Sequence, residues 1–136
     1  MPVPNKILIV DDSQAEARLM QAFLEQAGFW AVALSEPRRI EEVLEIERPS
    51  LILLDVVMPE RNGFQACREL KAHPDFGHIP IVMVTSKSTQ SDQFWGLQQG
   101  AEGYLVKPFT REQLLFEVNR VLGKQQTSAA GAAPQR

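Results

Sequence analysis

A short apolar run that ends on a single carboxylate constrains this chain more than any other feature. The run from Leu51 to Leu54 leads directly into Asp55, and the turn residues Pro59 and Gly63 follow closely. Such a run, with a turn close behind, is typical of a strand buried on both faces of a parallel sheet. Open α/β sheets bind ligands at the carboxyl ends of these strands, and a charge there is costly unless a neighbour compensates it. Asp55 is therefore the first candidate for chemistry.

Other predicted strands also end on polar or ionic side chains. The strands of a parallel sheet point the same way, so the residues that follow them are expected to gather at one edge. The side chains concerned are Asp11 and Asp12 after residues 6–10, Asp55 after residues 51–54, Thr85 after residues 79–84, and Lys107 after residues 104–106.

Helical segments alternate with the predicted strands. Residues 13–16 and residues 110–113 match capping boxes at helix starts, and Gly28 and Gly123 are expected to end helices. Strand and helix alternate five times along the chain. This alternation predicts an α/β fold with a parallel sheet, right-handed crossovers and helices on both faces.

Composition excludes several classes of protein. The chain has 136 residues and a formal net charge of -3. No stretch approaches the roughly 20 apolar residues of a membrane span, and no basic stripe suggests direct binding to nucleic acid. The lone cysteine, Cys67, cannot form an internal disulfide, which fits a reducing compartment. We therefore predict a cytoplasmic protein without membrane insertion.

The predicted edge has an electrostatic problem that points to a metal ion. Two carboxylates about 5 Å apart repel by roughly 3 kcal/mol at an effective dielectric constant near 20. Lys107 supplies one compensating charge, and a hard cation such as Mg²⁺ supplies two more. A free carboxylate beside a metal and an ammonium is suited to phosphoryl transfer, in which the carboxylate attacks phosphorus. The hydroxyl of Thr85 could donate to a phosphoryl oxygen.

Four segments resemble the receiver domain of bacterial two-component response regulators. The resemblance implies a flavodoxin-like, doubly wound sheet of five parallel strands in the order 2-1-3-4-5, with helices on both faces. It divides the chain into an N-terminal extension (residues 1–5), a receiver domain (residues 6–123) and a disordered tail or linker remnant (residues 124–136). The segments that carry it are Ile7–Ser13, Leu53–Pro59, Val82–Ser86 and Tyr104–Phe109.

The resemblance implies a role for each carboxylate. Asp55 would be the phosphoacceptor, and Asp12 and Asp55 would bind Mg²⁺ directly. Asp11 would contribute through water, and the carbonyl group of Val57 would complete the metal site. Val57 and Lys87 match positions whose side chains tune the lifetime of the phosphoryl group in the family.

The resemblance also implies a conformational switch. Thr85 would turn toward the phosphoryl group, Lys107 would pair with that group, and Tyr104 would rotate inward as Thr85 moves. The Lys107–Pro108 peptide bond is expected to be cis. Trp95 is either a core residue or part of the surface that, with Tyr104, contacts a partner.

The implied function is a signalling switch rather than an enzyme with a substrate of its own. A sensor histidine kinase, with the chemotaxis type as one option, would donate the phosphoryl group from a phosphohistidine. A downstream effector protein would bind the changed surface. The segment Phe94–Gly96 resembles single-domain regulators of twitching-motility and chemotaxis-like systems.

Three other functions share parts of the pattern. A phosphatase with an aspartyl nucleophile needs a second acid two residues after the nucleophile, where this chain has Val57. A flavin or nucleotide module needs a phosphate-binding loop after the first strand, where Asp11 and Asp12 would repel phosphate. A receiver fold that works as an interaction module without phosphorylation remains open.

Overall fold

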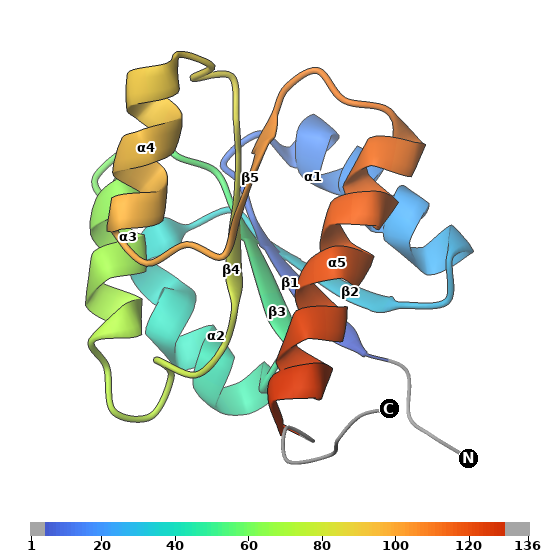
Figure 1. Ribbon diagram of the computed structural model, residues 1–136, viewed down its shortest axis with the longest axis horizontal. Helices are drawn as coiled ribbons and strands as arrows, with labels where there is room; N and C mark the ends of the chain where they lie inside the picture. The colour runs from blue at the N-terminus through green and yellow to red at the C-terminus, as the bar shows by residue number, and fades with distance from the viewer. Residues whose placement is uncertain (1–4, 130–136) are drawn as a thin grey trace.

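A five-stranded parallel sheet forms the centre of the computed structural model, which describes the backbone of residues 5–129 and the side chains of residues 5–123. The strands lie in the order β2-β1-β3-β4-β5, as predicted (Figure 1). All four neighbouring pairs are parallel. The strands are β1 (Lys6–Val10), β2 (Trp30–Leu34), β3 (Leu51–Leu54), β4 (Ile81–Thr85) and β5 (Gly103–Val106).

Helices cover both faces of this sheet. Figure 1 shows α1 and α5 on one face and α2, α3 and α4 on the other. None of the described helices has the length and apolar character needed to cross a membrane. The helices are α1 (Gln14–Gln26), α2 (Ile40–Glu47) after the 3-10 turn η1 (Pro37–Arg39), α3 (Gly63–Lys71), α4 (Gln90–Gln98) and α5 (Arg111–Ala129).

The central strands are apolar on both sides because each side faces a helical layer. In β1, Ile7 and Ile9 belong to the apolar cluster that includes residues of α1 and α5. Leu8 and Val10 belong to the opposite cluster, which includes residues of α2 and α3. Every residue of β3 is buried. Double coverage therefore explains the near-continuous apolar runs that predicted these strands.

Two predicted capping boxes have different outcomes. At α5 both halves form, because the N–H of Gln113 donates to Thr110 Oγ1 at 3.1 Å and the N–H of Thr110 donates to Gln113 Oε1 at 2.8 Å. At α1 the N–H of Glu16 donates to Ser13 Oγ at 3.3 Å, but the N–H of Ser13 donates to Asp11 Oδ1 at 2.9 Å. The predicted return bond from the Glu16 carboxylate was wrong, since this carboxylate pairs with a lysine instead.

The predicted end of the last helix at Gly123 was also wrong. Helix α5 continues to Ala129, so the first residues of the predicted tail are helical. A glycine in a helix interior costs about 1 kcal/mol relative to alanine, which weakens a helix without ending it, and Lys124 and Gln125 favour helix. Residues 1–4 of the predicted extension and residues 130–136 of the predicted tail lie outside the described residues, and the domain boundaries stay predictions.

Gly63 begins α3 where the chain passes very close to the end of β3. Its N–H donates to the carbonyl of Val56 at 2.8 Å. A Cβ atom on Gly63 would lie 2.2 Å from the carbonyl oxygen of Asp55 and 2.8 Å from Cα of Val56. Both neighbours are backbone atoms, so a larger residue at Gly63 would displace the strand end that carries Asp55.

We expect Gly63→Ala to lower the free energy of unfolding by roughly 1–3 kcal/mol, the usual cost of overpacking. Gly123→Ala is the matched control, because a Cβ there meets nothing within 4 Å. This control should stabilise the protein by up to about 1 kcal/mol through helix propensity. Urea denaturation followed by circular dichroism measures both changes, and equal stability of Gly63→Ala and the wild type would contradict the packing argument.

Candidate functional site

Three carboxylates from two neighbouring strands meet at the carboxyl edge of the sheet. Asp11 and Asp12 follow β1, and Asp55 follows β3. The two strands pair directly, with Val10 opposite Leu54. One carboxylate oxygen from each of the three aspartates lies within 4.8 Å of the other two. Asp11 and Asp55 are buried and Asp12 is exposed, so the cluster lies at the boundary between the core and solvent.

Lys107, which follows β5, contacts this cluster. Its Nζ donates to Asp11 Oδ2 at 2.9 Å, lies 3.7 Å from Asp55 Oδ2 and forms an ion pair with Glu16. The Lys107–Pro108 peptide bond is cis, as predicted. Burial acts to lower the pKa of Lys107, but its hydrogen bonds to Glu16 and Asp11 and the nearby charge of Asp55 raise the pKa overall. The ammonium group therefore stays charged.

Burial raises the pKa of Asp55 to about 6, from an ordinary value of 3.8. Lys107 acts to lower this pKa and Asp11 acts to raise it, while the N–H of Val56, 2.8 Å from Asp55 Oδ1, favours the charged form. Desolvation outweighs the favourable contacts. At neutral pH Asp55 is thus an ionised carboxylate with poor solvation, a condition that a nearby cation relieves.

The chemistry of this cluster fits a hard divalent cation. Mg²⁺ binds through one or two carboxylates and keeps several water molecules, which a partly exposed cluster allows. Val57, whose carbonyl group was predicted as a further ligand, lies two residues after Asp55, and its N–H also forms a hydrogen bond with Asp55. The three carboxylates thus offer oxygen ligands that Mg²⁺ prefers, and the role of the Val57 carbonyl stays a prediction.

A pocket of about 450 Å³ opens over the buried carboxylate. Asp55 and Lys107 lie in its wall together with several apolar side chains, so a phosphoryl group could approach Asp55 from this side. The remaining lining residues are Glu16, Leu19, Met20, Val57, Ser86, Pro108 and Phe109.

Both predicted switch residues bond to the backbone of Lys87. Thr85 is fully buried at the end of β4, and its hydroxyl accepts a hydrogen bond from the N–H of Lys87 at 3.3 Å. The hydroxyl of Tyr104 donates to the carbonyl of Lys87 at 2.7 Å. The ring of Tyr104 also packs against Gly96 of α4, where a Cβ atom would lie 2.9 Å from it. Thr85 and Tyr104 are therefore connected by hydrogen bonds to the backbone of the same residue, Lys87.

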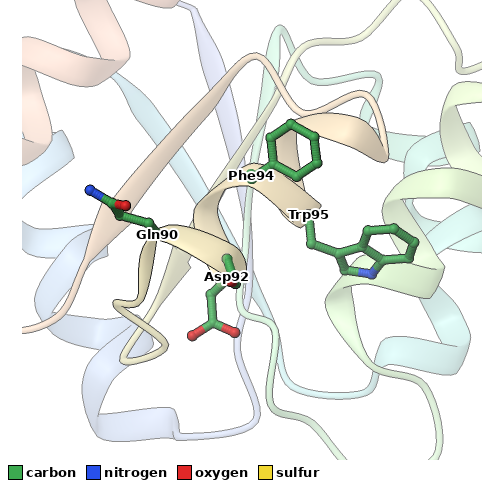
Figure 2. A pocket seen from close by; sticks show the side chains of 5 residues that line it. Gln90, Asp92, Phe94 and Trp95 are labelled. Carbon is green, nitrogen blue, oxygen red and sulfur yellow. The ribbon is translucent and has the colours of Figure 1, made fainter.

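Trp95 lies on the surface of α4 and not in the core. Its exposed fraction is 52%, and that of Phe94 is 62%. Figure 2 shows both side chains projecting from the helix, with Gln90 and Asp92 nearer its start. Trp95 is therefore a surface residue, and its contact with a partner stays a prediction.

Arg61 supports the loop after Asp55, and sequence reasoning missed it. Its side chain is 12% exposed. The guanidinium donates to Glu41 of α2 at 2.6 Å, to Glu69 of α3 at 2.8 Å and to the carbonyl of Pro37 at 3.0 Å. Arg61 thus ties the loop to both helices on this face. Pro37 and Glu41 lie 24 and 20 residues before Arg61, and Glu69 lies eight residues after it, so no regular helix or strand spacing indicated these contacts.

For Glu16, sequence reasoning identified only part of its role. Its position in a capping box gave its carboxylate a local partner, Ser13. In the structure that carboxylate pairs with Lys107 instead, and both residues line the pocket. A residue that fits a local motif can thus also belong to a distant site.

Comparisons with known proteins agree with this geometry. The family model described as response regulator receiver domain matches residues 7–119. Protein PilH of Pseudomonas aeruginosa is 40% identical over 117 residues, which cover 86% of this chain and 97% of PilH. The transcriptional regulatory protein GltR of the same organism is 37% identical over 122 residues, which cover 90% of this chain and 50% of GltR. The chain thus spans half the length of GltR.

Solved structures show the same fold. Chemotaxis protein CheY4 of Vibrio cholerae superposes with a TM-score of 0.81 at 30% identity, covering 87% of this chain and 98% of CheY4. The signal receiver domain of a signal transduction histidine kinase from Syntrophus aciditrophicus gives a TM-score of 0.80 at 35% identity, covering 88% of this chain and 91% of that domain.

The raised pKa of Asp55 predicts how stability depends on pH without metal. Between about pH 4 and pH 6 the folded protein binds more protons at Asp55 than the unfolded chain, so this group's contribution to stability falls as pH rises through that window. Asp55→Asn removes the cost of the buried charge. In EDTA at pH 7.5 we expect this variant to exceed the wild type in free energy of unfolding by on the order of 1–3 kcal/mol.

The difference should shrink as the pH falls below 6 and should approach zero below about pH 3, where Asp55 is protonated in both the folded and the unfolded state. Urea denaturation at a series of pH values measures it. Asp75→Asn is the matched control, because Asp75 is an exposed carboxylate in the loop after α3. A difference between Asp55→Asn and the wild type that does not vary with pH would contradict the electrostatic explanation.

Proposed function

This chain belongs to the family of response regulator receiver domains, and we propose that it is a phosphorylation-dependent signalling switch with Asp55 as its phosphoacceptor. One observation carries the proposal. The Asp55 carboxylate is buried beside Asp11 and Asp12, lies 3.7 Å from the ammonium of Lys107 and borders an open pocket. This arrangement suits a nucleophile that must hold a transferred phosphoryl group.

In the proposed reaction, a carboxylate oxygen of Asp55 attacks the phosphorus of a phosphohistidine on a sensor histidine kinase. An oxygen–phosphorus bond forms, the phosphorus–nitrogen bond breaks, and its electron pair stays on the imidazole of the donor. Bound Mg²⁺ would stabilise charge on the phosphoryl oxygens, and Asp11, Asp12, Asp55 and the Val57 carbonyl would hold it. The chain is thus an acceptor that assists its own phosphorylation and dephosphorylation.

Lys107 and Thr85 would respond to the new charge. The Nζ of Lys107 already lies near Asp55 and would pair with a phosphoryl oxygen after a small movement. Thr85 would donate its hydroxyl to another phosphoryl oxygen, which requires it to give up the hydrogen bond from Lys87. These two contacts with the phosphoryl group would favour the conformation of the phosphorylated state over that of the unphosphorylated state.

The proposed output is a change in the surface around Tyr104 and Trp95, which a downstream effector protein would bind. The similarity to PilH and to a chemotaxis protein supports a place in type IV pilus or chemotaxis-like motility. We propose the cytoplasm as the place of action, in keeping with the single buried thiol of Cys67.

We expect the wild type to form an acyl phosphate with phosphoramidate and Mg²⁺, and Asp55→Asn to form none, because an amide is not a nucleophile for this reaction. Intact-mass spectrometry detects the adduct. Chelation of Mg²⁺ with EDTA should slow the wild-type reaction by at least about tenfold, because the metal supplies several kcal/mol of charge stabilisation.

Asp75→Asn keeps all the residues assigned to the site and should react like the wild type. Labelling of Asp55→Asn at the wild-type rate would show that another residue accepts the phosphoryl group. A wild type that stays unlabelled would instead favour a receiver fold that works without phosphorylation.

A further inference from the structure

We propose that Glu16 is a charge gate at the mouth of the phosphoacceptor site. It holds Lys107 before phosphorylation and slows the entry of small phosphodonors that carry two negative charges. The inference rests on the proposed function and adds to it a residue that sets donor specificity.

The first observation is the set of partners of Lys107. Its Nζ forms an ion pair with Glu16 and donates to Asp11 at 2.9 Å, whereas its distance to Asp55 Oδ2 is 3.7 Å. The strongest contacts of the ammonium are therefore with carboxylates other than the acceptor. A phosphoryl group on Asp55 has to compete with Glu16 for this ammonium.

The second observation is the position of Glu16 in the pocket. The side chain of Glu16 is 52% exposed, while those of Lys107 and Asp55 are 15% and 9% exposed. All three line the same pocket. A donor that reaches Asp55 through this pocket therefore comes near the Glu16 carboxylate.

The third observation concerns charge. Among the described residues, the carboxylates grouped closely enough to share a cation are Asp11, Asp12 and Asp55, and Glu16 is not one of them. A bound cation would offset the charge of that group and leave Glu16 facing the entrance. Like charges a few ångströms apart in a partly desolvated pocket repel measurably, and a dianion is repelled more than a monoanion.

A purely structural role for Glu16 gives different expectations. Glu16 lies in the first turn of α1, where an acid interacts favourably with the helix dipole. Loss of that interaction would alter stability but would not distinguish one phosphodonor from another. Dependence of the rate on donor charge therefore separates the gate from a helix-end effect.

The test compares acetyl phosphate, a dianion near neutral pH, with phosphoramidate, which carries one fewer negative charge. Phosphorylation rates are measured with Mg²⁺ at a saturating concentration for each variant. We expect Glu16→Gln to raise the rate with acetyl phosphate by roughly three- to thirtyfold and the rate with phosphoramidate by a smaller factor. Glu16→Asp keeps the charge and should retain the wild-type ratio of the two rates.

Glu25→Gln is the matched control, because it removes the same charge from the same helix, about 13 Å along its axis from Glu16. It should leave both rates unchanged. Equal rates for Glu16→Gln and the wild type, or an equal increase with both donors, would overturn the gate while leaving the phosphoacceptor assignment intact. Absence of labelling in the wild type with either donor would overturn the proposed function and the gate with it.

Discussion

The contact between one ammonium and a group of crowded carboxylates sets the chemistry of this protein. Lys107 attracts Asp55 across 3.7 Å, while Asp11 repels it from within the same cluster. These two interactions oppose each other, and the loss of water around Asp55, which is the largest influence on its pKa, decides the outcome. Its pKa therefore rises to about 6 instead of falling, and the carboxylate is left in need of a cation.

The fold keeps this unfavourable arrangement in place from several directions. The pairing of β1 with β3 sets the aspartates side by side. The close start of α3 at Gly63 fixes the backbone of Asp55 from one side, and Arg61 anchors the following loop to α2 and α3. The apolar core supplies the stability that allows a buried charge to persist, as functional sites commonly require.

The sequence predicted the parts of the site that follow from topology alone. Parallel strands end at one edge, so Asp11, Asp55 and Lys107 could be placed together without coordinates. Glu16 and Arg61 required the three-dimensional structure, because their partners lie on elements distant in sequence.

Local signals also had limits at the helix ends. The expected stop at Gly123 failed, because the cost of one glycine is small beside the helical preference of its neighbours. The capping box at Ser13 and Glu16 formed only its first half, because a lysine side chain offered Glu16 a charged partner. At Gly123 and at the capping box, the local sequence preference was weaker than the effect of the neighbouring residues.

The site and the proposed output surface are linked through the backbone of Lys87. Its N–H donates to the hydroxyl of Thr85, and its carbonyl accepts from the hydroxyl of Tyr104. If Thr85 turns toward a phosphoryl group, that N–H loses its partner. The backbone at Lys87, whose carbonyl holds the hydroxyl of Tyr104, would then be less firmly held.

The ring of Tyr104 in turn packs on Gly96, the buried residue of α4, while Phe94 and Trp95 on the same helix face solvent. Helix α4 thus has a small buried contact and a large exposed apolar surface. The proposed rotation of Tyr104 would act directly on this contact with Gly96. Phe94 and Trp95 therefore lie on the helix that this proposed rotation would reach, in keeping with the proposed partner surface.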